Sequence, residues 1–273
     1  MAPEVSTRMP EPDPIPANRV PQARDRRYPG GRWAMYGLGI CITIVVWWVA
    51  TKFGGESLAK FAPDLTASAL REQLSNGRFW EGVWATLQRL GVGLGIAFII
   101  GFPVGLAVGY SPRANQLSYV SFQFLRMISP LSWTPVAIIL LGLGSEPVYF
   151  LISIAAVWPI IINTAAGVRA ADAQWIEVVR CLGAGHWEIL RHVLIRAALP
   201  NVLVGLQLAL GVAWIVIVPA EMLGVSSGLG YMILDFRDVN DYASIMAVIV
   251  VIGLIGVMLD LPLRTAIRRA SWD

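Results

Sequence analysis

Charged residues are scarce in this chain. Asp, Glu, Lys and Arg make up 14% of its 273 residues, whereas apolar residues make up 56%. Soluble domains carry roughly 25% charged residues, so this composition is not that of a soluble globular protein. The net charge of +3 gives no indication of a nucleic-acid partner. Composition therefore favours an integral membrane protein in contact with lipid.

Cysteine and histidine each occur only twice. Cys41 lies in an apolar run and Cys181 in a distant polar loop, a pattern that indicates neither a disulfide framework nor a metal site. His186 and His192 are six residues apart, which does not place them on one helical face as zinc ligands. We therefore expect no metal site in this chain.

Lysine is equally rare. Lys52 and Lys60 follow Thr51 and Ala59 rather than glycine, so the chain has no Walker A loop, in which glycine precedes the lysine. We expect the chain not to be an enzyme and to bind no cofactor itself. Any ATP that drives it, with its Mg, must then bind to another chain.

Two domains are predicted. Residues 1–32 contain seven prolines interleaved with arginines and acids, which predicts a disordered tail. We do not expect this tail to be a signal peptide, because the apolar run begins only after Arg32. Residues 33–270 are predicted to form an all-α membrane domain, since apolar runs of about 20 residues suffice to cross a bilayer. We expect about six spans, near residues 33–51, 86–109, 118–143, 148–166, 202–219 and 243–261.

Arginine is distributed unevenly over the two sides that six spans would create. The termini and even-numbered loops hold 14 arginines, including Arg113 and Arg169, whereas the opposite side holds five Lys or Arg residues. Positively charged loops stay in the cytoplasm. This predicts a multi-pass protein of the bacterial inner membrane with both termini and the 169–200 loop in the cytoplasm.

The 169–200 loop has two amphipathic segments. Trp175, Val178, Val179 and Leu182 can line one face of a first helix, which Gly183 and Gly185 would end. A second helix carries Trp187, Leu190 and Leu194 on one side. Two short helices joined by a tight turn favour a rigid docking surface for another protein, and an ordinary surface loop is the alternative.

This loop resembles the EAA loop of binding-protein-dependent importer permeases, which reads Glu-Ala-Ala, three residues, Gly, nine residues, then Ile-x-Leu-Pro. Glu177, Val178 and Val179 occupy the first three places, and Gly183 has the required spacing. Both alanines are valines here, and Arg196 replaces the final proline. The resemblance implies that Glu177 to Val179 and Gly183, with the adjacent Ala184 and Gly185, dock an ATPase through a coupling helix.

The likeness extends over roughly residues 60–265. Residues 86–111, 124–144 and 213–233 are similar to the permeases for nitrate, sulfonate, taurine and bicarbonate. The resemblance implies a fold like that of the methionine-importer permease and transport of a small anion. It also implies a homodimer, two cytoplasmic ATP-binding-cassette subunits and an extracytoplasmic solute-binding protein.

Three charged residues near the predicted spans require a physical reason. Arg126 either faces the translocation pathway, where it would favour an anion, or snorkels to the cytoplasmic face or pairs with Asp260. Arg89 begins a span and is expected to snorkel to the outer face. Glu221 is either a gate or an acceptor for backbone groups of the loop that follows.

Further pathway candidates surround these charges. Ser226 and Ser227 precede a short predicted helix whose amides would point at an anion. Trp133, Trp158 and Trp214 either line a cavity or pack between helices. A stand-alone secondary carrier or channel is the main alternative function, although it would need coupling carboxylates within spans. A membrane-embedded enzyme is a third possibility, but the chain lacks a paired catalytic arrangement.

Overall fold

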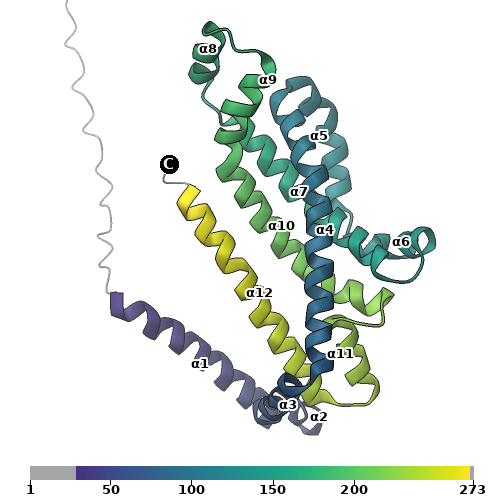
Figure 1. Ribbon diagram of the computed structural model, residues 1–273. Coiled ribbons are helices and arrows are strands. Elements are labelled where there is room, and N and C mark those ends of the chain that lie inside the picture. The colour runs from purple at the N-terminus through teal and green to yellow at the C-terminus, as the bar shows by residue number, and fades with distance from the viewer. Residues whose placement is uncertain (1–28, 271–273) are drawn as a thin grey trace, which may run out of the picture. The chain divides into compact units, whose positions relative to one another are not determined.

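The computed structural model describes residues 29–270, which form helices and connecting loops without a strand in that range (Figure 1). The helices are α1 (Pro29–Phe53), α2 (Glu56–Ala59), α3 (Pro63–Ser75), α4 (Gly77–Tyr110), α5 (Pro112–Met127), η1 (Pro130–Trp133), α6 (Thr134–Leu141), α7 (Ser145–Arg169), α8 (Ala173–Cys181), α9 (His186–Ile189), η2 (Leu190–Leu194), α10 (Ile195–Gly224), α11 (Leu229–Asp238) and α12 (Tyr242–Ala270). The predicted all-α class is confirmed.

The predicted tail lies mostly outside the described residues, which begin at Pro29. Residues 29–32, assigned to the tail on sequence grounds, instead form the first turn of α1. This helix passes from one compact unit, which ends at Val46, into a second unit that begins at Trp47 and holds all the other helices.

Four helices are long and apolar enough to cross a membrane, and a bent pair would make a fifth span. The four are α4, α7, α12 and a continuous helix of 39 residues from His186 to Gly224, which joins α9, η2 and α10. The apolar part of α1, Gly37–Phe53, is shorter than any of these. The described residues therefore support four or five spans of this length, so the predicted count of six is not confirmed.

The third predicted span, residues 118–143, is not a continuous helix. α5 and the η1–α6 segment meet at an angle of 85°. Ile128 and Ser129 adopt extended backbone angles, with ψ of 127° and 129°. The ring of Pro130 disfavours the helical conformation of the residue before it, and this explains the break.

The central core is a row of three long helices, in which α7 packs between α4 and α10. The glycines of α4 that recur at four-residue spacing, including Gly101, form a small-residue face that makes this packing possible. A Cβ atom at Gly105 would lie 2.7 Å from the Cβ of Thr164, and one at Gly109 would lie 2.7 Å from the Cβ of Val168. On the other side of α7, Gly205 of α10 approaches Asn163 with the same closeness, 2.8 Å. Small residues thus let both neighbours approach α7 closely.

The two ends of this helix row differ in what surrounds them (Figure 1). One end, called here the α8 end, holds α5, α8 and α9. The other, called here the α11 end, holds α3, α11 and the start of α4. A second apolar cluster lies at the α11 end and includes Phe79, Leu229 and Val248, from α4, α11 and α12.

Candidate functional site

The turn between α8 and α9 has the geometry expected of a helix end at glycine. Gly183 has a φ of +86°, a left-handed conformation that glycine adopts without strain. Its N–H donates to the carbonyl of Arg180 at 2.9 Å, and the N–H of Ala184 donates to the carbonyl of Val179 at 3.1 Å. Gly185 donates to the Glu188 carboxylate at 2.9 Å, which fixes the start of α9.

The α8–α9 loop is anchored by one set of apolar side chains and exposes another. Ile176, Val179, Ala184 and Ile189 pack with Val168, Leu194, Ala198 and Val202 of the neighbouring helices. Trp175, Val178, Leu182 and Trp187 are between 52% and 82% exposed. Val179 therefore does not share one face with Trp175, Val178 and Leu182, contrary to the prediction from the sequence. Glu177 is also exposed.

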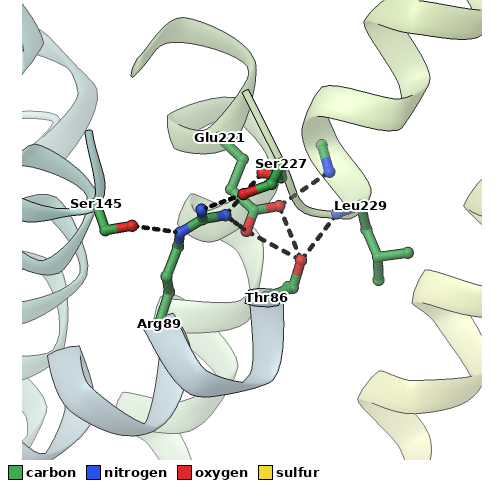
Figure 2. A network of polar contacts seen from close by, with 7 residues as sticks. Thr86, Arg89, Ser145, Glu221, Ser227 and Leu229 are labelled. Atoms are coloured by element: carbon green, nitrogen blue, oxygen red, sulfur yellow. Dashed lines mark hydrogen bonds and ion pairs between the residues drawn. The ribbon is translucent and has the colours of Figure 1, made fainter. Parts of the chain in front are cut away.

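A polar network lies at the α11 end and centres on two buried charges. Figure 2 shows Arg89 of α4 beside Glu221 of α10. The Nη1 atom of Arg89 lies 2.8 Å from the Oε1 atom of Glu221. Glu221 is fully buried and Arg89 is 6% exposed. The Thr86 hydroxyl lies 2.9 Å from both carboxylate oxygens and donates to the carboxylate.

The same network holds the connection from α10 to α11. Arg89 donates to the Ser227 carbonyl and hydroxyl, both at 2.7 Å, and to the hydroxyl of Ser145, at 3.1 Å (Figure 2). The N–H of Leu229 donates to Thr86, at 2.8 Å, and the N–H of Gly230 donates to Glu221, at 2.9 Å. Four segments of chain therefore meet at one ion pair.

This geometry corrects two expectations. Arg89 does not snorkel to the surface, because its guanidinium is held by Glu221 and Ser227. The first amides of α11 do not point at a free site for an anion, because they are bonded to Thr86 and Glu221. Of the two roles left open for Glu221, the contacts support that of an acceptor for backbone groups.

Gly228 is required by this packing. Its φ is +107°, and a Cβ atom there would lie 2.5 Å from the carboxyl carbon of Glu221. A larger residue would therefore displace the carboxylate. Next to Gly228, Ser226 and Ser227 line a cleft of ≈570 Å³ together with Arg89 and Ser145.

Arg126 lies at the other end of the structure, in the last turn of α5. Its side chain is exposed and donates to Gln123 at 3.0 Å. The alternative pairing with Asp260 is wrong, because Asp260 is bonded to Arg264 and to Gln207. Arg126 borders two cavities, one of ≈340 Å³ between α4, α5 and α7 and one of ≈430 Å³ along α7 and α10.

The three candidate tryptophans have different surroundings. Trp158 lines the larger of the two cavities beside Arg126 and makes an edge-on ring contact with Phe122, at 5.5 Å between centroids. Trp133 and Trp214 pack against the central core of α4, α7 and α10. Both alternatives are thus represented, with Trp158 beside a cavity and the other two between helices.

Comparison with known proteins identifies the family. Residues 97–269 match the family described as "Binding-protein-dependent transport system inner membrane component". The chain belongs to this family. The matched region begins within α4 and includes the bent pair, the α8–α9 loop, Glu221 and nearly all of α12.

Relatives resemble the chain over most of its length. It is 36% identical to the bicarbonate transport system permease protein CmpB of Synechococcus elongatus over 234 residues, which cover 81% of this chain and 84% of that protein. It is 31% identical to the putative aliphatic sulfonates transport permease protein SsuC of Bacillus subtilis, with 89% and 90% covered. The nitrate import permease protein NrtB of Leptolyngbya laminosa is 35% identical, with 67% and 66% covered.

The fold is also that of a solved transporter chain. A chain of the MetNI methionine ABC transporter, in an inward-facing conformation, superimposes with a TM-score of 0.61 and 20% identity. The superposition covers 69% of this chain and 94% of that chain. The expected likeness to a methionine-importer permease is therefore confirmed for the fold. The chain is a multi-pass membrane permease of the ABC transporter class.

Proposed function

We propose that this permease forms the translocation pathway of an ABC importer for a small anion of the nitrate, bicarbonate, taurine or alkylsulfonate class. The names of its relatives support the substrate class. The α8–α9 loop supports coupling to an ATPase, and this is the observation that carries the proposal. The permease itself performs no covalent chemistry, and ATP with Mg acts on the partner subunits.

The exposed apolar surface of the loop supports docking of another protein. Trp175, Val178, Leu182 and Trp187 are exposed in a segment whose opposite side is packed on the membrane helices. Exposed apolar groups that are rimmed by polar residues mark interaction sites in soluble parts of proteins. Glu177 and Arg180 supply charged neighbours on the same helix. This surface is therefore suited to an apolar groove with a polar rim on the ATPase.

Alternating access is the mechanism that such an assembly would use. The permease has an inward-open and an outward-open state, and ATP binding to the partner supplies the free-energy difference that moves the equilibrium between them. The arginine distribution supports a cytoplasmic position for both termini and for the α8–α9 loop in the bacterial inner membrane. A solute-binding protein delivers the anion on the opposite side.

A second copy of the chain completes the pathway in this proposal, since one loop docks one ATPase and the motor works as a pair. Arg126, Trp158 and the two cavities beside them are the best pathway candidates within one copy. The assembly is tested by the mass of the solubilised complex and by crosslinking between permease chains. A complex with one permease chain, or with a different second permease, would contradict the homodimer.

The docking proposal is tested by substituting Asp for Gly183. A matched control is available, because Gly55 lies in another loop and has a φ of +84°, close to the +86° of Gly183. A Cβ atom meets no other group within 4 Å at either position. The two substitutions therefore introduce the same charge with the same local strain, and only one of them lies in the proposed docking surface.

We expect Gly183→Asp to abolish copurification of the ATPase and solute uptake, because it buries an unpaired carboxylate in the interface. Protein level in the membrane should remain near normal. Gly55→Asp should retain both copurification of the ATPase and solute uptake. Uptake that is unchanged in Gly183→Asp would remove the loop as the docking site and would favour a stand-alone carrier or channel.

A further inference from the structure

The cavity between α4, α5 and α7 has positive charge without a counter-charge. Arg126 of α5 and Arg169 of α7 both line this space of ≈340 Å³, and no carboxylate lines it. Within residues 29–270 neither arginine is part of an ion pair. Two guanidinium groups that border one small cavity repel each other, and an anion between them would remove that repulsion.

The amide side chains of the cavity are oriented as donors. The Oδ1 atom of Asn115 accepts from Arg169 at 3.4 Å, and the Oε1 atom of Gln123 accepts from Arg126 at 3.0 Å. Each amide oxygen is therefore engaged by an arginine, which leaves the NH₂ groups of Asn115 and Gln123 to donate. Donors and positive charge without an opposing acid fit an oxyanion.

The size and walls of the cavity narrow the ligand class. Ile161, Ile162 and Ala165 of α7 form an apolar wall opposite the polar residues. A volume of this size holds a small oxyanion or the phosphate of a lipid headgroup, and guanidinium groups bind both through charge-assisted hydrogen bonds. The shared chemistry is an oxygen-rich anion held by two arginines.

The cavity adjoins the second cavity, which is part of the proposed translocation pathway. Arg169 is the last residue of α7, directly before the α8–α9 loop, so the cavity lies at the α8 end. Arg126 and Ile162 also line the second cavity, which extends along α7 and α10 past Trp158. Arg126 therefore stands at the boundary between the two cavities.

We infer that this cavity is an oxyanion-binding site, formed by Arg126 and Arg169 with Asn115 and Gln123, at the α8 end of the permease. It rests on the proposed function only in identifying the transported anion as one source of the ligand. The headgroup of an anionic phospholipid is the other source, and both would bind the same guanidinium groups.

The test uses the purified full-length chain in phosphatidylcholine nanodiscs, titrated with sodium nitrate, sodium bicarbonate and inorganic sulfate at constant ionic strength. The variants are Arg126→Gln and Arg169→Gln. Arg113→Gln is the matched control, because Arg113 is an exposed arginine of α5 that does not line the cavity. Affinity is measured calorimetrically, and a second set of nanodiscs contains phosphatidylglycerol to supply the lipid phosphate.

We expect each cavity variant to weaken binding of at least one of the three anions by roughly tenfold or more, the size expected for loss of a charged hydrogen bond. Arg113→Gln should bind as the wild type does. If the lipid is the ligand, phosphatidylglycerol will compete with the anions, and native mass spectrometry will show it retained by wild type and Arg113→Gln and lost from the cavity variants.

The inference is overturned if wild type and both cavity variants bind all three anions equally and retain equal amounts of phosphatidylglycerol. It is also overturned if the wild type binds none of these ligands. These measurements need no ATPase, so failure of the docking proposal would leave them unaffected. Conversely, a wild type that binds none of these ligands would not alter the outcome of the Gly183→Asp experiment.

Discussion

The two ends of the permease use charged and apolar groups in opposite ways. At the α11 end, Arg89 and Glu221 are buried, and their polar atoms are bonded to each other and to neighbouring loops. At the α8 end, Arg126 and Arg169 border a cavity that no carboxylate lines. Trp175, which follows Arg169 in the chain by six residues, is exposed. The first arrangement joins segments of one chain, whereas the second leaves groups available for other molecules.

This contrast assigns the stability of the fold to the α11 end and the binding of other molecules to the α8 end. A buried ion pair that also satisfies backbone groups is costly to break, because the remaining charge has no replacement for its partner. Exposed apolar groups on a loop contribute little to folding. Substitutions at the α11 end should therefore lower stability, while substitutions at the α8 end should lower assembly and binding. Three predictions test this separation, from the largest expected change in stability to the smallest.

Replacing Arg89 by Met should have the largest effect. It leaves the Glu221 carboxylate buried and removes the donors that hold Ser227, and the expected loss in unfolding free energy is about 3–5 kcal/mol. Arg78→Met is the matched control, because Arg78 pairs with Asp235 at 3.3 Å with both side chains exposed. Thermal unfolding in nanodiscs measures both. Equal melting temperatures for the two variants would mean that the buried ion pair stabilises the protein no more than the exposed one does.

Replacing Thr86 by Val should have an intermediate effect. The hydroxyl of Thr86 donates to Glu221 and accepts from the N–H of Leu229, so its loss leaves both buried groups with one partner fewer. The expected loss is about 1–3 kcal/mol. Thr66→Val is the control, since Thr66 is also buried but its hydroxyl bonds only the carbonyl of Ala62, the residue before its own helix. A smaller loss in Thr86→Val than in Thr66→Val would contradict the role given to the network.

Replacing Leu182 by Ser should have almost no effect on stability, because Leu182 is 82% exposed. The expected change is within about 0.5 kcal/mol, although copurification of the ATPase should fall. Leu194→Ser removes a side chain that is 2% exposed, in the helix that follows the loop, and should instead destabilise the protein. A Leu182→Ser variant that unfolds readily would mean that this side chain is part of the core.

Local features of the fold could be predicted from the sequence. The spacing of Gly101, Gly105 and Gly109 on one helical face indicates close packing, and the structure places α7 against that face. Gly183 follows an amphipathic run at the position of a helix end, and its positive φ confirms this. Both features depend on neighbours along the chain, which is why the sequence contains enough information to predict them.

The break of the third span also has a local signal in the sequence. Pro130 lies in the middle of residues 118–143, and proline disfavours a helical conformation in the residue before it. The apolar length of the segment argued for one continuous span. The steric effect of the proline ring prevailed, and the chain turns by 85° at this point.

The Arg89–Glu221 pair had no local signal. The two residues are 132 positions apart, and each lies near the end of a predicted span, where a charge can also reach water by itself. Only the packing of α4 against α10 brings them together. The same reasoning explains the wrong Arg126–Asp260 alternative, because Gln207 and Arg264 supply closer partners for Asp260.

The continuous helix from His186 to Gly224 has a mechanical consequence. Its 39 residues give it a length of about 58 Å at 1.5 Å per residue, from the α8–α9 loop to Gly224, where the connection to α11 begins. A tilt of about 5° at the loop would displace the far end by about 5 Å, if the helix moved as a rigid rod. The wider π-helical turn at Leu190–Leu194 lies near the loop, so most of the rod is beyond it. Glu221 lies on that distant part of the helix, so a tilt that begins at the proposed ATPase contact would reach the Arg89–Glu221 ion pair at the α11 end.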